Sequence, residues 1–200
     1  MTITAEQFAM GMTPNAYQEQ MTQNREAFAA NIVAAPVTAD DIAPFTGLPT
    51  PLRVLVVTED WCGDSLAHLP VLFRLAQESG KLHVRVFKRD EHKDLAAQFP
   101  MSTGRVAIPI IVFFSGAMHE RGRFLERPAI AHAEMETFMA EWFQKHPSYG
   151  NPGTPISALS PEARQVLFAA LTPWRKGRLD AWNRAAVAQF ITIATGSVPA

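Results

Sequence analysis

Apolar runs alternate with polar turns through the middle of the chain, and they predict an α/β fold. Residues 53–58 (RVLVVT) are apolar and mostly β-branched, which is typical of a strand buried on both faces of a parallel or mixed sheet. Residues 82–88 (LHVRVFK) alternate as a strand does, and residues 110–115 (IIVFFS) form another apolar run. Residues 119–125 are the predicted hairpin partner of that run. Together these segments predict a central mixed sheet of about four strands flanked by helices.

The segments between and after these strands are predicted to be helices. Residues 63–79 hold Pro70 inside, where a kink is expected, and their inner face is formed by Leu66, Leu69, Leu72, Phe73 and Ala76. Gly80 is the expected end of this helix. Further helices are predicted over residues 91–99, 128–145, from Ser160 onward, and 173–195.

The first 46 residues carry helix signals and no strand pattern. Thr13 before Pro14 is an N-cap followed by proline at the first helical position. The segment from Thr38 to Asp41 resembles an acidic capping box. Apolar residues recur at helical spacing and predict one buried face, formed by Tyr17, Met21, Phe28 and Ile32.

Length and composition favour one structural domain with extensions. The 200 residues are 48% hydrophobic, which supports one core but would be cramped for two full domains. We divide the chain into a helical N-terminal arm (1–48), a central α/β domain (49–146) and a helical C-terminal extension (147–200). The arm is also a candidate contact in a homodimer.

Charge and hydropathy argue against nucleic-acid and membrane partners. The formal net charge is -1, and no basic stripe is present. The first 50 residues hold one arginine against five acidic residues, so they would repel phosphate or anionic lipid. No segment approaches the roughly 18 apolar residues of a membrane span, and no signal peptide is evident. A single cysteine fits a reducing compartment, so we expect a soluble, cytoplasmic protein.

Cys62 is the main candidate for chemistry. It lies in the sequence Trp61-Cys62-Gly63-Asp64-Ser65, where the first predicted strand ends and a helix begins. A helix N-terminus offers unpaired N–H groups and a positive dipole end, which favour the nucleophilic thiolate. Gly63 permits a tight turn, Trp61 can shield one side, and Ser65 is one helical turn away, where its hydroxyl can donate to the sulfur. The opposing interpretation is a small buried hydrophobic residue.

Charged residues near Cys62 would have opposing effects on its pKa. Glu59, Asp60 and Asp64 would raise it if they lie close, whereas the helix dipole and Arg105 would lower it. Arg105 is also a candidate for holding an anionic partner, such as a glutathione-like carboxylate.

Over about residues 50–145 the sequence resembles the thioredoxin superfamily. Trp61-Cys62-Gly63 follows an apolar strand and an acidic dipeptide, and Pro70, eight residues after the cysteine, is similar to the family's helix-kinking proline. Ile108-Pro109 resembles the family's cis-proline loop. The resemblance implies that the Ile108–Pro109 bond is cis, that its loop lies beside Cys62, and that this loop offers backbone hydrogen bonds to an extended substrate. The chain looks closest to a branch of small bacterial thioredoxin-like proteins with a W-C-G-D motif.

Three positions depart from that family's pattern. Ser65 stands where the dithiol motif has its second cysteine, and a serine cannot resolve a mixed disulfide. The family's buried aspartate, six residues before the cysteine, is Val56, and its partner lysine falls at about Val86. A monothiol CxxS site remains.

We therefore predict a thioredoxin-like monothiol thiol–disulfide oxidoreductase, with Cys62 as the nucleophile and Ser65 as a stabiliser of its thiolate. The expected partner is a disulfide-containing protein or a small thiol. No tightly bound cofactor and no metal are expected, and a low-molecular-weight thiol such as glutathione is the expected co-substrate. Contacts to the substrate are predicted for Trp61, Gly63, Asp64, Arg105, Ile108 and Pro109.

Two other functions stay open. The first is a non-catalytic thioredoxin-fold module that binds peptides or acts as a chaperone, with an incidental thiol. The second, ranked last, is a glutathione-transferase-like protein, since the tail after Lys145 looks too short for that family's helical domain. The six histidines show no metal-ligand spacing, and His68 is expected to be solvated.

Overall fold

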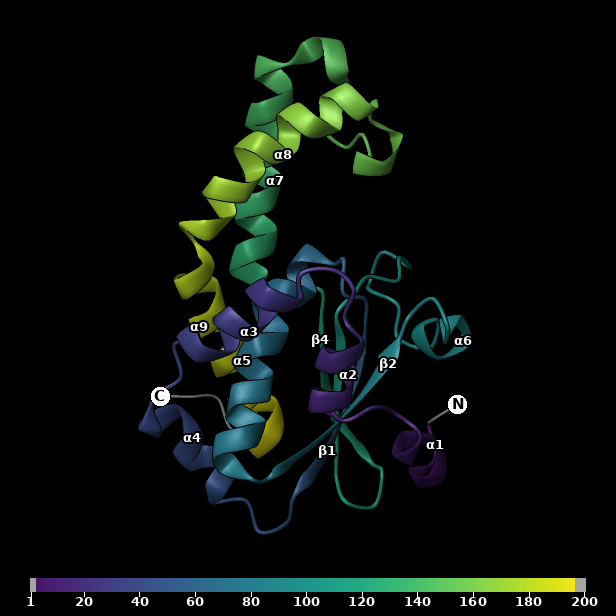
Figure 1. The fold of residues 1–200 in the computed structure, drawn as a ribbon, viewed down its shortest axis with the longest axis vertical. Helices are drawn as coiled ribbons and strands as arrows, with labels where there is room; N and C mark the ends of the chain where they lie inside the picture. The colour runs from purple at the N-terminus through teal and green to yellow at the C-terminus, as the bar shows by residue number, and fades with distance from the viewer. Residues whose placement is uncertain (1–2, 197–200) are drawn as a thin grey trace. The chain divides into compact units, whose positions relative to one another are not determined.

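The structure, a computed structural model, describes residues 3–196 (Figure 1). The chain divides into two compact units. One holds the residues up to Pro128 together with those from Asn183 onward, and the other is Ala129–Trp182. Each unit has a hydrophobic core of its own.

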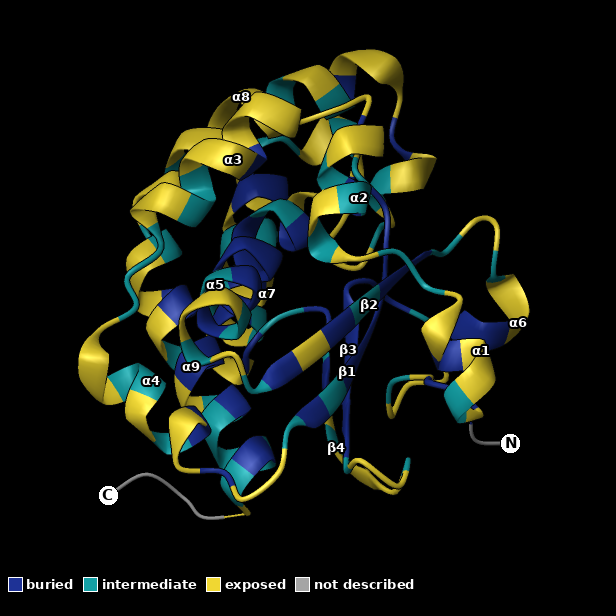
Figure 2. Cartoon of the chain, turned by 60° about the horizontal axis from the view of Figure 1, so that its bottom comes forward, coloured by how far each residue is buried: buried dark blue, intermediate teal, exposed yellow. Residues whose placement is uncertain are grey.

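A four-stranded mixed sheet organises the first unit, which confirms the predicted α/β fold. Its strands are β1 (Leu52–Thr58), β2 (Leu82–Lys88), β3 (Ile110–Phe114) and β4 (Glu120–Leu125), in the order β2-β1-β3-β4. β1 pairs with β2 in parallel and with β3 antiparallel, and β3 pairs with β4 antiparallel. β1 and β3 are therefore interior strands, and in Figure 2 the edge strand β2 carries yellow and teal bands.

Helix α5 (Gly63–Ser79) makes the crossover that the parallel pair of β1 and β2 requires. It matches the predicted span, contains Pro70 and ends at Gly80, whose φ of 62° is the left-handed conformation that glycine adopts readily. α6 (Lys93–Ala96) is shorter than predicted, because the chain on both sides of it forms turns.

The N-terminal arm is helical as predicted, in four short helices. These are α1 (Ala5–Ala9), α2 (Pro14–Gln20), α3 (Arg25–Ala34) and α4 (Ala39–Thr46). Thr13 caps α2 and Thr38 caps α4 through a capping box, as expected.

The predicted apolar face of the arm spans two helices, because the chain turns between α2 and α3 at Asn24, where φ is 57°. Tyr17, Met21 and Phe28 are buried in the core that also contains β1 and α5, while Ile32 is half-buried against it. The arm thus packs on its own sheet. The dimer contact stays a prediction, and it would use the arm's exposed face.

The second unit contains α7 (Ala129–Lys145), two short 3₁₀ turns (Pro147–Tyr149 and Ile156–Ala158) and α8 (Pro161–Lys176). The division between the units falls within α9 (Leu179–Thr195). The predicted start of the last helix at Pro173 is wrong. Pro173 lies inside α8, because the buried stripe of Ala163, Leu167 and Leu171 carries that helix to Lys176.

A single bridge joins the arm to the edge of the sheet. Met12 and Val86 exchange both backbone hydrogen bonds, at 2.9 and 2.8 Å. The neighbouring Gly11 approaches β2 so closely that a Cβ there would lie 2.5 Å from the ring of Phe87 and 2.9 Å from the Cβ of Arg85. Since Phe87 is buried, its ring has little room to move.

We predict that Gly11→Ala lowers the free energy of unfolding by about 1–3 kcal/mol through overpacking. Urea denaturation followed by circular dichroism measures this change. Gly116→Ala is the matched control, because nothing lies within 4 Å of a Cβ at Gly116, and it should change the value by less than about 0.5 kcal/mol. Equal stability of the two variants would contradict the close packing of the arm.

Candidate active site

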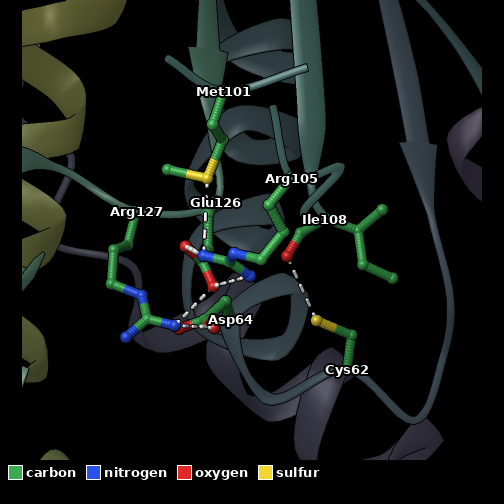
Figure 3. Close-up of polar contacts among 7 residues, drawn as sticks. All are labelled: Cys62, Asp64, Met101, Arg105, Ile108, Glu126 and Arg127. Carbon is green, nitrogen blue, oxygen red and sulfur yellow. Dashed lines mark hydrogen bonds and ion pairs between the residues drawn. The ribbon is translucent and has the colours of Figure 1, made fainter. Parts of the chain in front are cut away.

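Cys62 occupies the N-cap position of α5, directly after the turn that follows β1. Its side chain is buried, with 7% of the residue exposed, and its thiol donates a hydrogen bond to the carbonyl oxygen of Ile108 at 3.4 Å (Figure 3). The Ile108–Pro109 peptide bond is cis. The helix start and the Ile108–Pro109 loop, 46 residues apart in the chain, therefore meet at the sulfur.

Burial raises the pKa of the Cys62 thiol above its ordinary value, and the raising effects outweigh the lowering ones. The Ser65 hydroxyl lowers the pKa through a hydrogen bond, the charge of Asp64 raises it, and the backbone N–H groups of Ser65 and Asp64 lower it. The ordinary pKa of a cysteine is about 8.5. Cys62 consequently rests as a thiol at neutral pH, although a helix begins there.

The hydroxyl of Thr58 holds the Ser65 hydroxyl in place beside the sulfur of Cys62. Thr58 donates to the Ser65 Oγ at 2.6 Å, and both residues are buried. Because this oxygen already accepts a hydrogen bond, its own proton is available for the sulfur of Cys62. Two consecutive hydrogen bonds therefore lead from Thr58, the last residue of β1, through the Ser65 hydroxyl to the sulfur of Cys62.

Two of the three positions that depart from the dithiol pattern lie next to each other. Val56 and Val86 are direct partners across the β1–β2 pair, and both are fully buried. An apolar pair therefore fills the place where the superfamily resemblance implies an acid and a base. Neither valine can take a proton from Cys62.

A network of ion pairs lies beside the Ile108–Pro109 loop (Figure 3). Arg127 Nη2 lies 2.8 Å from Asp64 Oδ2 and 2.8 Å from Glu126 Oε1. Arg105 binds both oxygens of Glu126, at 2.6 and 3.2 Å. Asp64 is buried and pairs with Arg127, whereas the Arg105 side chain is 57% exposed, and the predicted contact of each with substrate stays a prediction.

Glu126 and Arg127 were not identified from the sequence, because their place depends on the register of the β3–β4 hairpin, which was not predicted. The structure pairs Ile110 with Leu125, which puts the next residue opposite Pro109. The Glu126 N–H indeed donates to the Pro109 oxygen at 2.8 Å. The register of the hairpin, once known, would have placed an acid beside Arg105.

Asp60 anchors the arm next to the site. Its Oδ2 accepts hydrogen bonds from the N–H groups of Thr22 and Gln23, at 2.7 and 3.0 Å, and its backbone oxygen accepts one from Asn24. Burial opposes ionisation of Asp60, but these hydrogen bonds outweigh it and lower its pKa. The next residue, Trp61, is 44% exposed and lies under the guanidinium of Arg89, 5.1 Å from the ring centre.

The expectation that His68 is solvated is wrong. His68 is fully buried on the inner face of α5, with Nδ1 3.1 Å from Asn183 Oδ1 and its ring against Phe124. Helical periodicity alone did not place it, because α5 is covered on several sides and buries ten of its residues. Within residues 3–196, no group of three or more His, Cys, Asp and Glu side chains is arranged to hold a metal ion. In the same residues, no helix has the length and apolar character to cross a membrane.

Comparisons with known proteins identify the fold. A family model described as Thioredoxin matches residues 11–141. A protein of unknown function, PA1234 from Pseudomonas aeruginosa, is 17% identical with a TM-score of 0.66, over 98% of this chain and 99% of that one. An HIV epitope scaffold is 17% identical with a TM-score of 0.61, over 96% and 98%. No curated protein matches the chain.

We predict that the alkylation rate of Cys62 by iodoacetamide rises through pH 7–9 without levelling off, because burial holds the thiol pKa above its ordinary value of about 8.5. Ser65→Ala removes a hydrogen bond that favours the thiolate, so it should shift this profile further toward alkaline pH. The urea-unfolded protein serves as the control and should titrate near the ordinary value. A plateau below pH 8 would contradict the burial argument.

We also predict that Asp60→Ala lowers the free energy of unfolding by about 1–2 kcal/mol at pH 7, because three hydrogen bonds to the half-exposed carboxylate are lost. A lowered folded-state pKa means that this contribution is complete above the unfolded pKa of about 3.9 and is lost as pH falls through the folded value. Urea titrations at pH 7 and at acid pH test both statements. Glu19→Ala, on the exposed end of α2, is the control and should have little effect.

Proposed function

Because the chain belongs to the thioredoxin family, and because its one cysteine begins a helix beside the Ile108–Pro109 loop, we propose that it is a monothiol thiol–disulfide oxidoreductase. The observation that carries the proposal is the meeting of Cys62 with the Ile108 carbonyl at the start of α5. Around this sulfur lie the Ser65 hydroxyl and two backbone N–H groups, each of which favours the thiolate.

The proposed reaction is two successive thiol–disulfide exchanges. Cys62 loses its proton to solvent, and its thiolate attacks one sulfur of the substrate disulfide; an S–S bond forms to Cys62 as the substrate's S–S bond breaks and releases a thiolate. The thiolate of a low-molecular-weight thiol, such as glutathione, then attacks the substrate sulfur of the mixed disulfide; an S–S bond forms between this thiol and the substrate as the S–S bond to Cys62 breaks and releases the Cys62 thiolate. The electrons come from this external thiol, so no bound cofactor takes part.

The residues around Cys62 set the rate of the first step. Burial and the Asp64 charge keep the thiol protonated at neutral pH, and the valine pair at positions 56 and 86 supplies no base. Attack is therefore slow at pH 7 and accelerates about tenfold per pH unit while the pH stays below the thiol pKa. Ser65 cannot displace the substrate, so the mixed disulfide persists until a second thiol arrives.

Of the predicted substrate contacts, Trp61, Gly63 and Arg105 are exposed, whereas the others are buried. Trp61 would flank the entering disulfide, and Arg105 is the cation that the carboxylate of an anionic thiol would meet. Ile108 and Pro109 would contribute backbone hydrogen-bonding groups and the shape of the groove. Gly63 would act through the tight turn, and Asp64 through its ion pair with Arg127. A cytoplasmic location, where glutathione-type thiols are abundant, fits this cycle.

The proposal predicts a mixed disulfide of Cys62 after incubation with oxidised glutathione. Mass spectrometry should find one adduct per chain, with a single-turnover rate that rises about tenfold between pH 7 and pH 8. Oxidised glutathione carries no thiol, so this pH dependence reports Cys62 alone. Cys62→Ser is the negative control. Ser65→Cys should release the glutathione by forming an internal disulfide.

Turnover is the second measurement. Glutathione-dependent reduction of a small disulfide should be faster with the wild-type chain than with Cys62→Ser, and Arg105→Ala should raise the concentration of glutathione needed. Absence of any adduct up to pH 9, with an intact fold, would refute the enzyme and leave the peptide-binding alternative.

A further inference from the structure

A cleft of about 730 Å³ runs along the edge strand β2 and is lined in part by Leu82–Arg85, at the start of that strand. Because β1 and β2 are parallel and Cys62 follows the end of β1, the cleft lies at the opposite end of the strands from the thiol. Its volume is in the range of ordinary ligand sites. It is thus separate from the proposed oxidoreductase site.

Backbone groups of β2 face into this cleft. The N–H and C=O of Val86 point away from β1, because both are bonded to Met12 of the arm. In a strand, every second peptide group points the same way, so those of Leu82 and Val84 also point outward. The arm forms no backbone hydrogen bond to them among those described, although α2 begins at Pro14 and lines the same cleft. Val84 O accepts only a side-chain hydrogen bond, from Arg85 Nη1 at 3.1 Å, among those described.

The two walls of the cleft differ in character. Arg53 and His83 are register partners across β1 and β2, and Arg85 is two residues further, so all three lie on one face of the sheet. The other wall contains Phe73, Ala76 and part of α2. None of the residues that line the cleft, all within the described part of the chain, is acidic.

The two arginines in the basic wall are half-buried, and neither forms an ion pair with another described residue. Arg53 lies 5.9 Å from the ring centre of Phe8, and Arg85 bonds to the backbone of its own strand. Arg53 also interacts electrostatically with Glu6 of α1, so the charge of Arg85 is the more available of the two to a ligand.

We propose that this cleft binds an extended peptide segment of a partner protein, which adds to the β2 edge as a short strand. Strand addition satisfies the outward peptide groups of Leu82 and Val84, and main-chain hydrogen bonds supply the affinity. Alternate side chains of a strand point to opposite faces, so acidic residues meet Arg53, His83 and Arg85 while apolar residues meet the Phe73 wall. At about 3.3 Å per residue, the lining segment Leu82–Arg85 is about 10 Å long, so a segment of three to five residues would pair along it.

The test uses the full chain and a capped peptide, acetyl-EVEVE-amide, observed by ¹H–¹⁵N NMR. We expect saturable shifts at the amides of residues 82–86, weakened by added salt because the charge attraction is screened. A peptide of the same composition in the order EEVVE should bind at least tenfold more weakly, because its alternation is lost. Acetyl-KVKVK-amide should not bind.

Two arginine variants test whether the basic wall of the cleft, rather than any surface charge, binds the peptide. Arg85→Glu should weaken EVEVE binding at least tenfold and permit binding of KVKVK, whereas Arg74→Ala, on the outer face of α5, should change neither. Equal binding of EVEVE and EEVVE, or displacement of EVEVE by citrate at equal concentration, would show a simple anion site and overturn strand addition. Shifts confined to the residues around Cys62, or no shifts at millimolar peptide, would also overturn it. None of these outcomes depends on thiol chemistry.

Discussion

The double pairing of β1 is the constraint on which the rest of the structure depends. β1 is held by β2 on one side and β3 on the other, and all but one of its residues are buried. A parallel partner cannot be reached by a tight turn, so the chain must leave the end of β1 and return through a helix. That requirement fixes the N-terminus of α5, and with it Cys62, at one end of the sheet. The antiparallel partner β3 begins directly after the Ile108–Pro109 bond, so the same pairing brings that loop to the sulfur.

Two opposing effects act on Cys62, and their balance decides what kind of thiol it is. Hydrogen bonds from Ser65 and from the first N–H groups of α5 favour the thiolate, as its place at a helix start suggests. Loss of solvent and the neighbouring Asp64 charge disfavour it, and these prevail. Arg127 lies 2.8 Å from the Asp64 carboxylate, and the charge of that carboxylate acts on the sulfur. Cys62 therefore lies at a helix start, as reactive cysteines often do, but it is a protonated thiol at neutral pH.

The sequence was most informative where a pattern is local. The strands, α5 with its terminal Gly80, and the caps at Thr13 and Thr38 follow from periodicity and capping chemistry, and the structure agrees with them. Partners distant in sequence were beyond such patterns. Glu126 meets Arg105 only because of the hairpin register, and Asp60 meets Thr22 only because the arm folds back across the site.

Burial was predicted least well, for the same reason. His68 looked like a surface residue of an amphipathic helix, but α5 is covered on more than one side, and Asn183 from the other end of the chain meets its ring. The raised pKa of Cys62 has the same origin: the helix start was visible in the sequence and the family resemblance implied the neighbouring loop, but neither indicated how completely the thiol is buried. The loss of solvent around a side chain depends on how many helices, strands and loops pack against it. The sequence of the segment that carries the side chain does not contain that information.

The arm touches the sheet at two places that matter chemically. At Met12 it bridges the edge strand beside the β2 cleft, and at Thr22 and Gln23 it binds Asp60, two residues before Cys62. Between these contacts lies α2, whose buried Tyr17 packs edge-on against Phe73 of α5, a residue that also lines the cleft. A strand bound at the β2 edge would contact this wall directly. It could alter the thiol only if it favoured one arrangement of the arm over another, because a ligand with equal affinity for both arrangements shifts nothing. The hydrogen bonds at Asp60 are the contacts through which such a preference would reach Trp61 and Cys62.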